Sequence, residues 1–291
     1  MSLTSMVLDR VRGYVEERIL YPSCPGSKTL PSPPVGIQTN PAELLNALRR
    51  DGMLIFPHYL DSTDVNSVMG AAEEAYRGRR PDILTTDSTE SAYRYINNPL
   101  RLSRKVLSLA CDPFLVELIE AYFQCDVFLA EVDMRRVLPV TMEEFAGLSP
   151  KNAQGYSPSH WHYDMRGRQV KVMVYLTDVG EGDQNFAFCP GTHESRSDVP
   201  RSRTDYAKSR FPDGWPETHG RRVVECYGQA GTVMIFDTNG IHRLRRTKRS
   251  QRDSFTFYYT PGQALRPLDY DRAQVELIHP EFRRLLGGSR K

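Results

Sequence analysis

The stretch SHWHYD at residues 159–164 carries the side chains best suited to binding a metal ion. In an extended strand alternate side chains share a face, so His160, His162 and Asp164 are expected to project together. A histidine and a carboxylate two residues apart can occupy adjacent corners of one metal, and a second histidine from elsewhere completes a two-histidine, one-carboxylate triad. A lone HxD tripeptide is weak evidence, because a half-buried strand with a hydrogen-bonded polar face explains it more simply.

The second histidine is supplied by the segment GTVMIFDTNGIHR, in which His242 follows an apolar strand and a short Asp-Thr-Asn-Gly connection. Ten residues further on, Arg252 opens the strand segment RDSFTFYYT. An arginine in this place can bind a carboxylate through two hydrogen bonds, at the far end of a pocket whose floor is the metal. The spacing therefore favours a metal centre that works together with a bound organic anion.

The elements that must position these residues change in kind at about residue 125. Before that point three helices are predicted, beginning at Asn40-Pro41, at Asp61 or Ser62, and at Asp112-Pro113. A short strand is expected in MLIFPHYL. After that point seven β-rich segments recur between Gly, Pro and Asp turns, which is typical of a sandwich or barrel and not of βαβ units. The sequence therefore predicts a mainly β fold with a helical flank.

The expected domain organisation is one domain with appendages. Residues 1–39 are predicted to form an N-terminal arm with a Pro-rich linker, because YPSCPGSKTLPSPPVG excludes helix and central strand. The single domain is expected to span residues 40–291, with the helical flank at 40–124, the β core at about 125–262 and a C-terminal tail at 263–291. An insertion at 195–219 lacks periodicity, and loops of that length are usually functional lids or disordered.

Composition sets further limits on the class of protein. The chain of 291 residues is 40% hydrophobic and 25% charged, with a formal net charge of +2, so no nucleic-acid partner is expected. No apolar run approaches the roughly 18–20 residues of a membrane span, and Asp9 and Arg10 interrupt any signal peptide. Five scattered cysteines without a CxxC pair argue against a disulfide framework or a zinc knuckle. We expect reduced cysteines and a cytoplasmic protein.

Several motifs in a fixed order resemble the phytanoyl-CoA dioxygenase-like family of Fe(II)/2-oxoglutarate-dependent oxygenases. Across roughly residues 40–260 they are DGMLIFPHYL, DPFLVELIEAYF, HWHYD, VYLTDV, PGTH, GTVMIFD, IHR and an arginine on the last core strand. The resemblance implies a double-stranded β-helix, a cupin-like jelly-roll barrel with iron near one mouth. It implies Fe(II), 2-oxoglutarate and O2 as cofactor and cosubstrates. By position it assigns the metal to His162, Asp164 and His242, and 2-oxoglutarate to Arg252.

Two features depart from the family's pattern. A Ser or Thr often lies two residues after the distal histidine in the family, whereas this chain has Leu244. The cosubstrate arginine is also ambiguous, because Arg252 ends a basic run that contains Arg243, Arg245, Arg246, Lys248 and Arg249. Arg252 is preferred because the others read as loop, whereas it begins a strand that can aim its side chain inward.

The candidate substrate residues are Arg135, Tyr163 and Trp215. Strand alternation lets only one of Arg135 and Arg136 face the pocket. Tyr163 could flank the pocket mouth, and Trp215, in the insertion, could close over a bound ligand. The insertion is also rich in arginine, which suggests a small, anionic substrate, although a basic surface loop is often merely solvated.

The expected reaction is hydroxylation of a small molecule, coupled to decarboxylation of 2-oxoglutarate to succinate. Desaturation, epoxidation or cyclisation at the same site is the alternative, and a non-catalytic metal- or ligand-binding jelly roll is the alternative of another class. Related halogenases have a small residue in place of the carboxylate, so Asp164 argues against halogenation. The sequence does not indicate the substrate or the oligomeric state.

Overall fold

The computed structural model describes residues 39–154, 158–164, 167–194, 209–261, 268–270 and 285–286. The predicted N-terminal arm up to residue 38, residues 195–208 of the insertion and most of the predicted C-terminal tail lie outside the described residues. Two tail residues that are described, Leu285 and Leu286, are buried in the main hydrophobic core.

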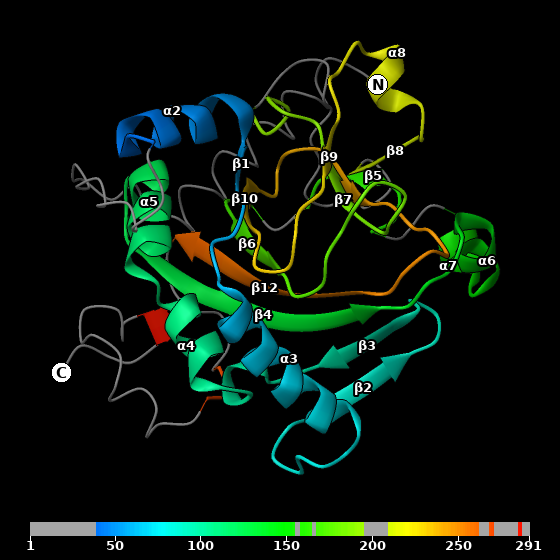
Figure 1. Ribbon diagram of the computed structural model, residues 1–291. Coiled ribbons are helices and arrows are strands. Elements are labelled where there is room, and N and C mark those ends of the chain that lie inside the picture. Colours follow the sequence, from blue (N-terminus) through cyan, green and yellow to red (C-terminus); the bar gives the residue numbers. More distant parts are fainter. Residues whose placement is uncertain are drawn as a thin grey trace.

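Two antiparallel sheets organise the described part of the chain. The larger sheet has the strand order β1 (Met53–Phe56), β10 (Val233–Asp237), β6 (Val170–Tyr175), β12 (Arg252–Pro261), β4 (Val127–Val137), β3 (Tyr93–Ile96) and β2 (Thr85–Ser88). The smaller sheet has the order β8 (Arg210–Phe211), β5 (Trp161–His162), β11 (His242–Leu244), β7 (Phe186–Phe188) and β9 (Val224–Cys226). Figure 1 shows β12 and β4 crossing the middle of the molecule, with the smaller sheet on one side.

The predicted helical flank is present and follows the caps in the sequence. It contains α2 (Pro41–Asp51), α3 (Ser62–Tyr76), the short 3-10 helix η1 (Pro99–Arg101), α4 (Arg104–Ala110) and α5 (Pro113–Phe123). The side chains of Asn40, Asp61 and Asp112 each accept a hydrogen bond from a backbone N–H in the first turn of a helix. The remaining short helices are α6 (Met142–Gly147), α7 (Pro150–Ala153) and α8 (Trp215–Thr218).

The middle of the larger sheet is buried on both faces, and β12 shows how. Its residues Phe255, Phe257 and Tyr259 pack into the main core, together with the apolar sides of α2 to α5. Alternate residues on the opposite face, such as Thr256 and Tyr258, face the space between the sheets and line a pocket there. All ten residues of β12 are buried as a result. This two-sided burial confirms the predicted mainly β fold with a helical flank.

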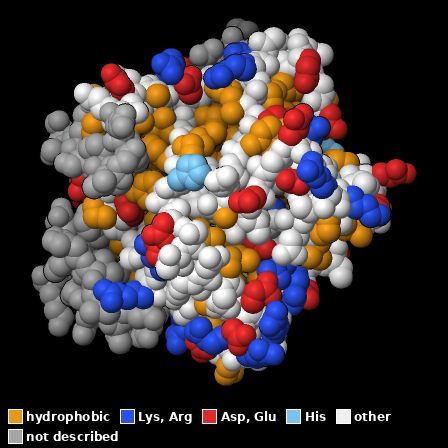
Figure 2. All heavy atoms as spheres, in the orientation of Figure 1, with side chains coloured by type: hydrophobic (Ala, Val, Ile, Leu, Met, Phe, Trp, Pro, Cys, Tyr) orange, Lys and Arg blue, Asp and Glu red, His pale blue; other side chains and the backbone are white. Residues whose placement is uncertain are grey.

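The strand predictions succeed for the apolar segments, including the edge strands β1 and β9, but miss β2, β3 and β8. The hairpin of β2 and β3 has no clear alternation and was not expected, yet it extends the larger sheet beside β4. The segment predicted to bind a metal, residues 159–164, forms only the two-residue strand β5, so His160 lies just outside it. None of the described helices is long and apolar enough to cross a membrane. On the face in Figure 2, acidic and basic side chains are interspersed, in keeping with the small net charge.

Gly231 lies in the turn that leads into β10. Its φ is +92°, and a Cβ at this position would lie 2.3 Å from the carbonyl oxygen of Leu60. Gly78 has a similar φ of +71° but open space around it. We expect Gly78→Ala to lower the free energy of unfolding by about 1 kcal/mol through backbone strain alone, and Gly231→Ala by about 2–4 kcal/mol because the Leu60 segment must also move. Urea unfolding measures both variants. Equal losses in the free energy of unfolding would contradict a clash between the new Cβ at position 231 and Leu60.

Candidate functional site

Three potential metal ligands meet between the sheets, in the pattern expected from the sequence. His162 in β5 and His242 in β11 are directly paired, and their ring centroids lie 4.3 Å apart. Asp164 follows β5, and its backbone N–H donates to the carbonyl oxygen of Thr238. Oδ1 of Asp164 lies 3.6 Å from Nε2 of His162 and 3.8 Å from Nε2 of His242. Each of the three residues offers one ligand atom, and these three atoms all lie within 4.8 Å of one another.

Both imidazoles are oriented by their own backbone. Nδ1 of His162 lies 2.8 Å from the carbonyl oxygen of His160, and Nδ1 of His242 lies 2.8 Å from that of Gly240. An Nδ1–H that donates to these carbonyls leaves the lone pair of Nε2 directed at the centre of the cluster. Burial lowers the pKa of His162 well below its usual range and that of His242 to about 4. Both rings are therefore neutral at physiological pH, as a metal requires.

Asp164 is charged in spite of its burial. Burial alone would raise the pKa of this carboxyl group, but the neighbouring Lys171 ammonium holds it well below its usual range. The Lys171 ammonium in β6 donates to Oδ2 of Asp164 over 2.6 Å. An ionised carboxylate beside two neutral imidazoles is a donor set that suits a divalent transition metal.

Arg252 lies in the same pocket with unused hydrogen-bond donors. Its residue exposure is 5%, and Nε and Nη1 have no hydrogen-bond partner among the described residues. Its guanidinium carbon lies 5.6 Å from the ring centroid of Tyr175. A buried guanidinium with orphaned donors indicates a place for an anion.

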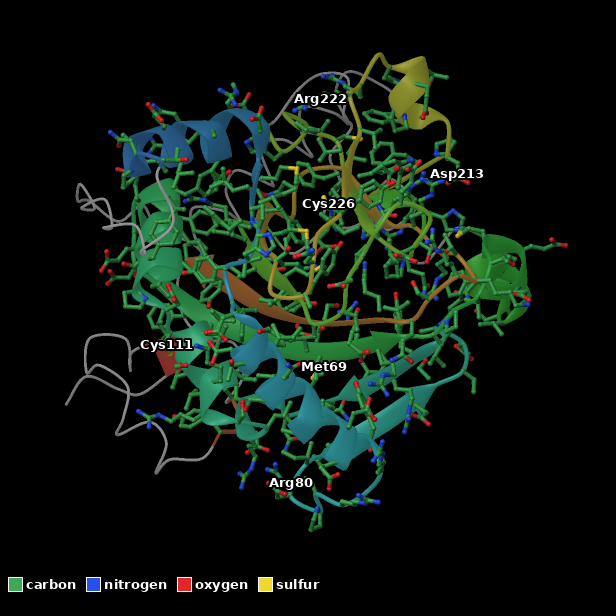
Figure 3. All side chains as sticks on the ribbon, in the orientation of Figure 1. Met69, Arg80, Cys111, Asp213, Arg222 and Cys226 are labelled. Carbon is green, nitrogen blue, oxygen red and sulfur yellow. The ribbon has the colours of Figure 1, made fainter. Side chains whose placement is uncertain are left out.

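The rest of the basic run is engaged elsewhere. Arg246 donates to the Ser159 hydroxyl and the Ser91 carbonyl and stacks over Phe145, with 3.8 Å from its guanidinium carbon to the ring centroid. The others form polar contacts outside the pocket, which are Arg243 with Asp213, Arg245 with Glu225, Lys248 with Glu144, and Arg249 with the carbonyl of Glu181. Asp213 is labelled near β8 in Figure 3. Among these six side chains Arg252 alone lines the pocket.

The pocket has a volume of about 410 Å³ and lies between the two sheets. The described residues that line it are Tyr93, Glu131, Arg135, Pro158, His162, Tyr163, Asp164, Lys171, Met173, Phe186, Arg210, Phe236, His242, Leu244, Arg252, Thr256 and Tyr258. This volume is at the lower end for small-molecule sites, and the lining mixes apolar walls with charged groups of both signs.

The structure places the three candidate substrate residues in different surroundings. Arg135 lines the pocket, and its guanidinium donates to the Tyr258 hydroxyl. Tyr163 also lines the pocket, although it is almost fully buried and packs beside Phe211. Trp215 is not among the described lining residues. It packs on the far side of the smaller sheet, where its ring contacts Phe211 and stacks on His219, so its side chain lies away from the pocket in this structure.

Two other histidines of the sequence have structural contacts. Nε2 of His160 lies 3.3 Å from the carbonyl oxygen of Asn152, and Nε2 of His193 lies 3.0 Å from that of Arg49.

Burial raises the pKa of the Cys111, Cys189 and Cys226 thiols to about 12, which fits the expectation of inert core cysteines. Figure 3 shows Cys226 in the interior between the sheets.

Several pocket residues were not singled out individually from the sequence, among them Tyr93, Lys171, Arg210 and Tyr258. Strand alternation placed Tyr258 on the face of Arg252, but its role depends on neighbouring strands. Lys171 lies opposite Tyr258 in the pairing of β6 with β12, and Arg210 lies opposite His162 in the pairing of β8 with β5. These pairings join segments far apart in the chain, so no local signal could have found them.

Comparison with known proteins decides the family. The chain matches the phytanoyl-CoA dioxygenase (PhyH) family over residues 48–251. It belongs to this family. The protein is therefore a non-haem, Fe/2-oxoglutarate-dependent oxygenase, and the predicted enzyme class and the predicted iron and 2-oxoglutarate are confirmed. No curated protein sequence matches the chain.

Solved structures of oxygenases share the fold. The carbocyclase SnoK from nogalamycin biosynthesis has a TM-score of 0.56 at 16% identity, over 86% of this chain and 95% of that one. The epimerase SnoN, in complex with Fe3+, α-ketoglutarate and nogalamycin RO, has a TM-score of 0.51 at 17% identity, over 75% and 82%. HygX from Streptomyces hygroscopicus, with nickel, 2-oxoglutarate and hygromycin B, has a TM-score of 0.51 at 19% identity, over 79% and 92%. The predicted double-stranded β-helix is confirmed.

Arg136 is the outward neighbour of the pocket residue Arg135. Its Nε donates to Oδ1 of Asp253 over 2.8 Å, and Asp253 is fully buried. Burial raises the pKa of Asp253 and Arg136 opposes that rise. Arg136→Met should lower the free energy of unfolding by about 3–5 kcal/mol at neutral pH, because it leaves a buried carboxylate without its cation.

Urea unfolding of Arg136→Met at two pH values checks this expectation. Because the pKa of Asp253 is raised in the folded state, the variant's loss of stability is fully present above that pKa. The loss shrinks as the pH falls, because Asp253 then becomes neutral. The difference from the wild type should therefore decrease at acidic pH. Arg249→Ala, which removes an exposed arginine, is the control and should change stability little. A loss that does not depend on pH would show that packing of Arg136, and not its charge, matters.

Proposed function

We propose that His162, Asp164 and His242 hold Fe(II), that Arg252 binds the distal carboxylate of 2-oxoglutarate, and that the enzyme hydroxylates a small molecule. The cosubstrate then occupies the pocket from the histidine pair towards the start of β12. Succinate and CO2 are its products.

The observation that carries this proposal is the buried guanidinium of Arg252. Its Nε and Nη1 lack partners among the described residues, whereas each other basic residue from 243 to 249 has a polar contact elsewhere. A buried cation without an anion is costly. A dicarboxylate that reaches from the metal ligands to Arg252 would remove that cost. A non-catalytic jelly roll has no need for such an anchor opposite a metal.

The donor atoms fit iron without rearrangement of the strands. Two neutral imidazoles and one carboxylate, with one donor atom of each within 4.8 Å of the others, match the facial triad of non-haem iron oxygenases. When bound, Fe(II) would activate O2, which is the oxidant of the reaction: one oxygen atom would enter the substrate and the other would enter succinate as 2-oxoglutarate loses CO2.

The surrounding residues exclude water and shape the cosubstrate site. The rings of Phe186 and Phe236 both lie 5.5 Å from the His242 ring, centroid to centroid, and shield one side of it. Leu244 lines the pocket where the family often has a hydroxyl group, so it offers the methylenes of the cosubstrate an apolar contact in place of a hydrogen bond. Arg252 therefore has to supply more of the recognition of the distal carboxylate.

An anionic group on the substrate is favoured by Arg210, which lies beside His162. It lines the pocket, and burial lowers its pKa to about 10, so it stays charged at neutral pH. A positive charge within a partly buried site attracts and orients an anion. Other outcomes, such as desaturation, epoxidation or cyclisation, would use the same residues, since they differ in where the substrate's reactive carbons lie.

Binding of 2-oxoglutarate to the anaerobic, Fe(II)-loaded protein tests the assignment through its metal-to-ligand charge-transfer absorbance. The wild type should show the band. His162→Ala should lose both metal and band, because only two ligands remain. Arg252→Gln should keep the metal but raise the Kd for 2-oxoglutarate by about tenfold to a hundredfold, since one charge-assisted pair is worth about 1.5–3 kcal/mol.

Arg249→Ala is the matched control, since it removes a neighbouring arginine that contacts the Glu181 carbonyl outside the pocket. Its 2-oxoglutarate titration should equal that of the wild type. An Arg252→Gln variant with unchanged cosubstrate affinity would move the anchor to another residue. A wild-type protein that binds iron but shows no band would contradict the proposed site.

A further inference from the structure

Lys171 contacts one of the proposed metal ligands and has no role in the assignment above. It is the second residue of β6, the strand between β10 and β12, and its side chain is 13% exposed. Its ammonium lies 2.6 Å from Oδ2 of Asp164. Lysine is rarely buried without a specific partner, so this contact needs an explanation.

The two oxygens of Asp164 have separate environments. Oδ1 faces both histidines, at 3.6 Å from Nε2 of His162 and 3.8 Å from Nε2 of His242. Oδ2 accepts from Lys171 instead. A metal at the histidine pair and an ammonium on Oδ2 are both cations and repel one another at short range. Each is therefore confined to its own oxygen.

Other residues fix the position of the ammonium. Nζ of Lys171 lies 4.6 Å from the centroid of the Tyr258 ring, which lies opposite it in the sheet. The Tyr258 hydroxyl accepts from Arg135 and donates to Asp133, so its ring cannot turn away freely. In the described part of the chain, Asp164 is the carboxylate that forms an ion pair with Lys171.

We propose that Lys171 is a positioning residue that holds Oδ2 of Asp164, so that this carboxylate ligates the metal through Oδ1 alone. The inference rests on the proposed metal centre. A carboxylate bound through both oxygens would occupy an additional coordination position. Lys171 thereby keeps that position for the cosubstrates, and its charge also favours the dianionic 2-oxoglutarate.

Substitution of Lys171 in the full-length protein, loaded with Co(II) under anaerobic conditions, tests this role. The d–d absorption of Co(II) weakens as its coordination number rises. Lys171→Met should still bind one Co(II) per chain, but with weaker d–d bands, because Oδ2 becomes free to ligate. Its Kd for 2-oxoglutarate should rise by about tenfold or more, in line with other residues that orient metal ligands.

Two further variants separate positioning from packing. Lys171→Arg keeps a cation near Oδ2 and should restore the d–d intensity, while Lys171→Gln keeps a hydrogen bond but not the charge and should be intermediate. Gln also provides the test if Lys171→Met does not fold. Lys248→Met, which removes an exposed ion pair with Glu144, is the control for loss of a lysine and should match the wild type.

Two results would overturn the role of Lys171. One is a wild-type Co(II) spectrum together with a 2-oxoglutarate Kd within about twofold of wild type in Lys171→Met, or in Lys171→Gln if Met does not fold. The other is loss of Co(II) from all three Lys171 variants, which would show that the residue is needed for the fold of the site. Failure of the wild type itself to bind Co(II), or retention of Co(II) by His162→Ala, would overturn the proposed metal centre as well.

Discussion

The position of β12 in the middle of the larger sheet is the constraint on which the site depends. It pairs with β4 along one side and with β6 along the other, and both of its faces are buried. One face must therefore be apolar to pack on the helices, and the other is free to carry polar groups into the space between the sheets. Arg252, Thr256 and Tyr258 enter the pocket because Phe255 and Phe257 are held in the core.

Burial of charge decides what each polar group in the pocket can do. Asp164 remains ionised because the Lys171 ammonium pairs with it, whereas Arg252 forms no ion pair with a carboxylate among the described residues. In a medium of low polarity an unpaired charge is expensive, so such a group points to a missing ligand and not to a packing element. The same reasoning separates Arg252 from the rest of the basic run, whose members form polar contacts elsewhere.

The smaller sheet carries the two histidines of the proposed metal site, and its strands are only two or three residues long. Such short strands have little stability of their own, so backbone contacts outside the ladder must fix the ligands. Carbonyls of His160 and Gly240 orient the imidazoles, and that of Thr238 holds the backbone of Asp164. An aromatic cluster on the outer face, with Trp161 and Trp215, covers the sheet.

The sequence by itself determined the helical flank, the mainly β core and the candidates His162, Asp164, His242 and Arg252, because caps, strand alternation and ordered motifs are local or nearly local signals. Only the tertiary structure decided which arginine of the basic run lies in the pocket, with Nε and Nη1 unpaired among the described residues, that Arg135 and not Arg136 enters the pocket, and that Lys171 and Arg210 lie beside the proposed metal ligands. The hairpin of β2 and β3 also escaped prediction, since its pairing with β4 and not its composition makes it a sheet. These outcomes depend on strand register between segments distant in sequence, which no local pattern encodes.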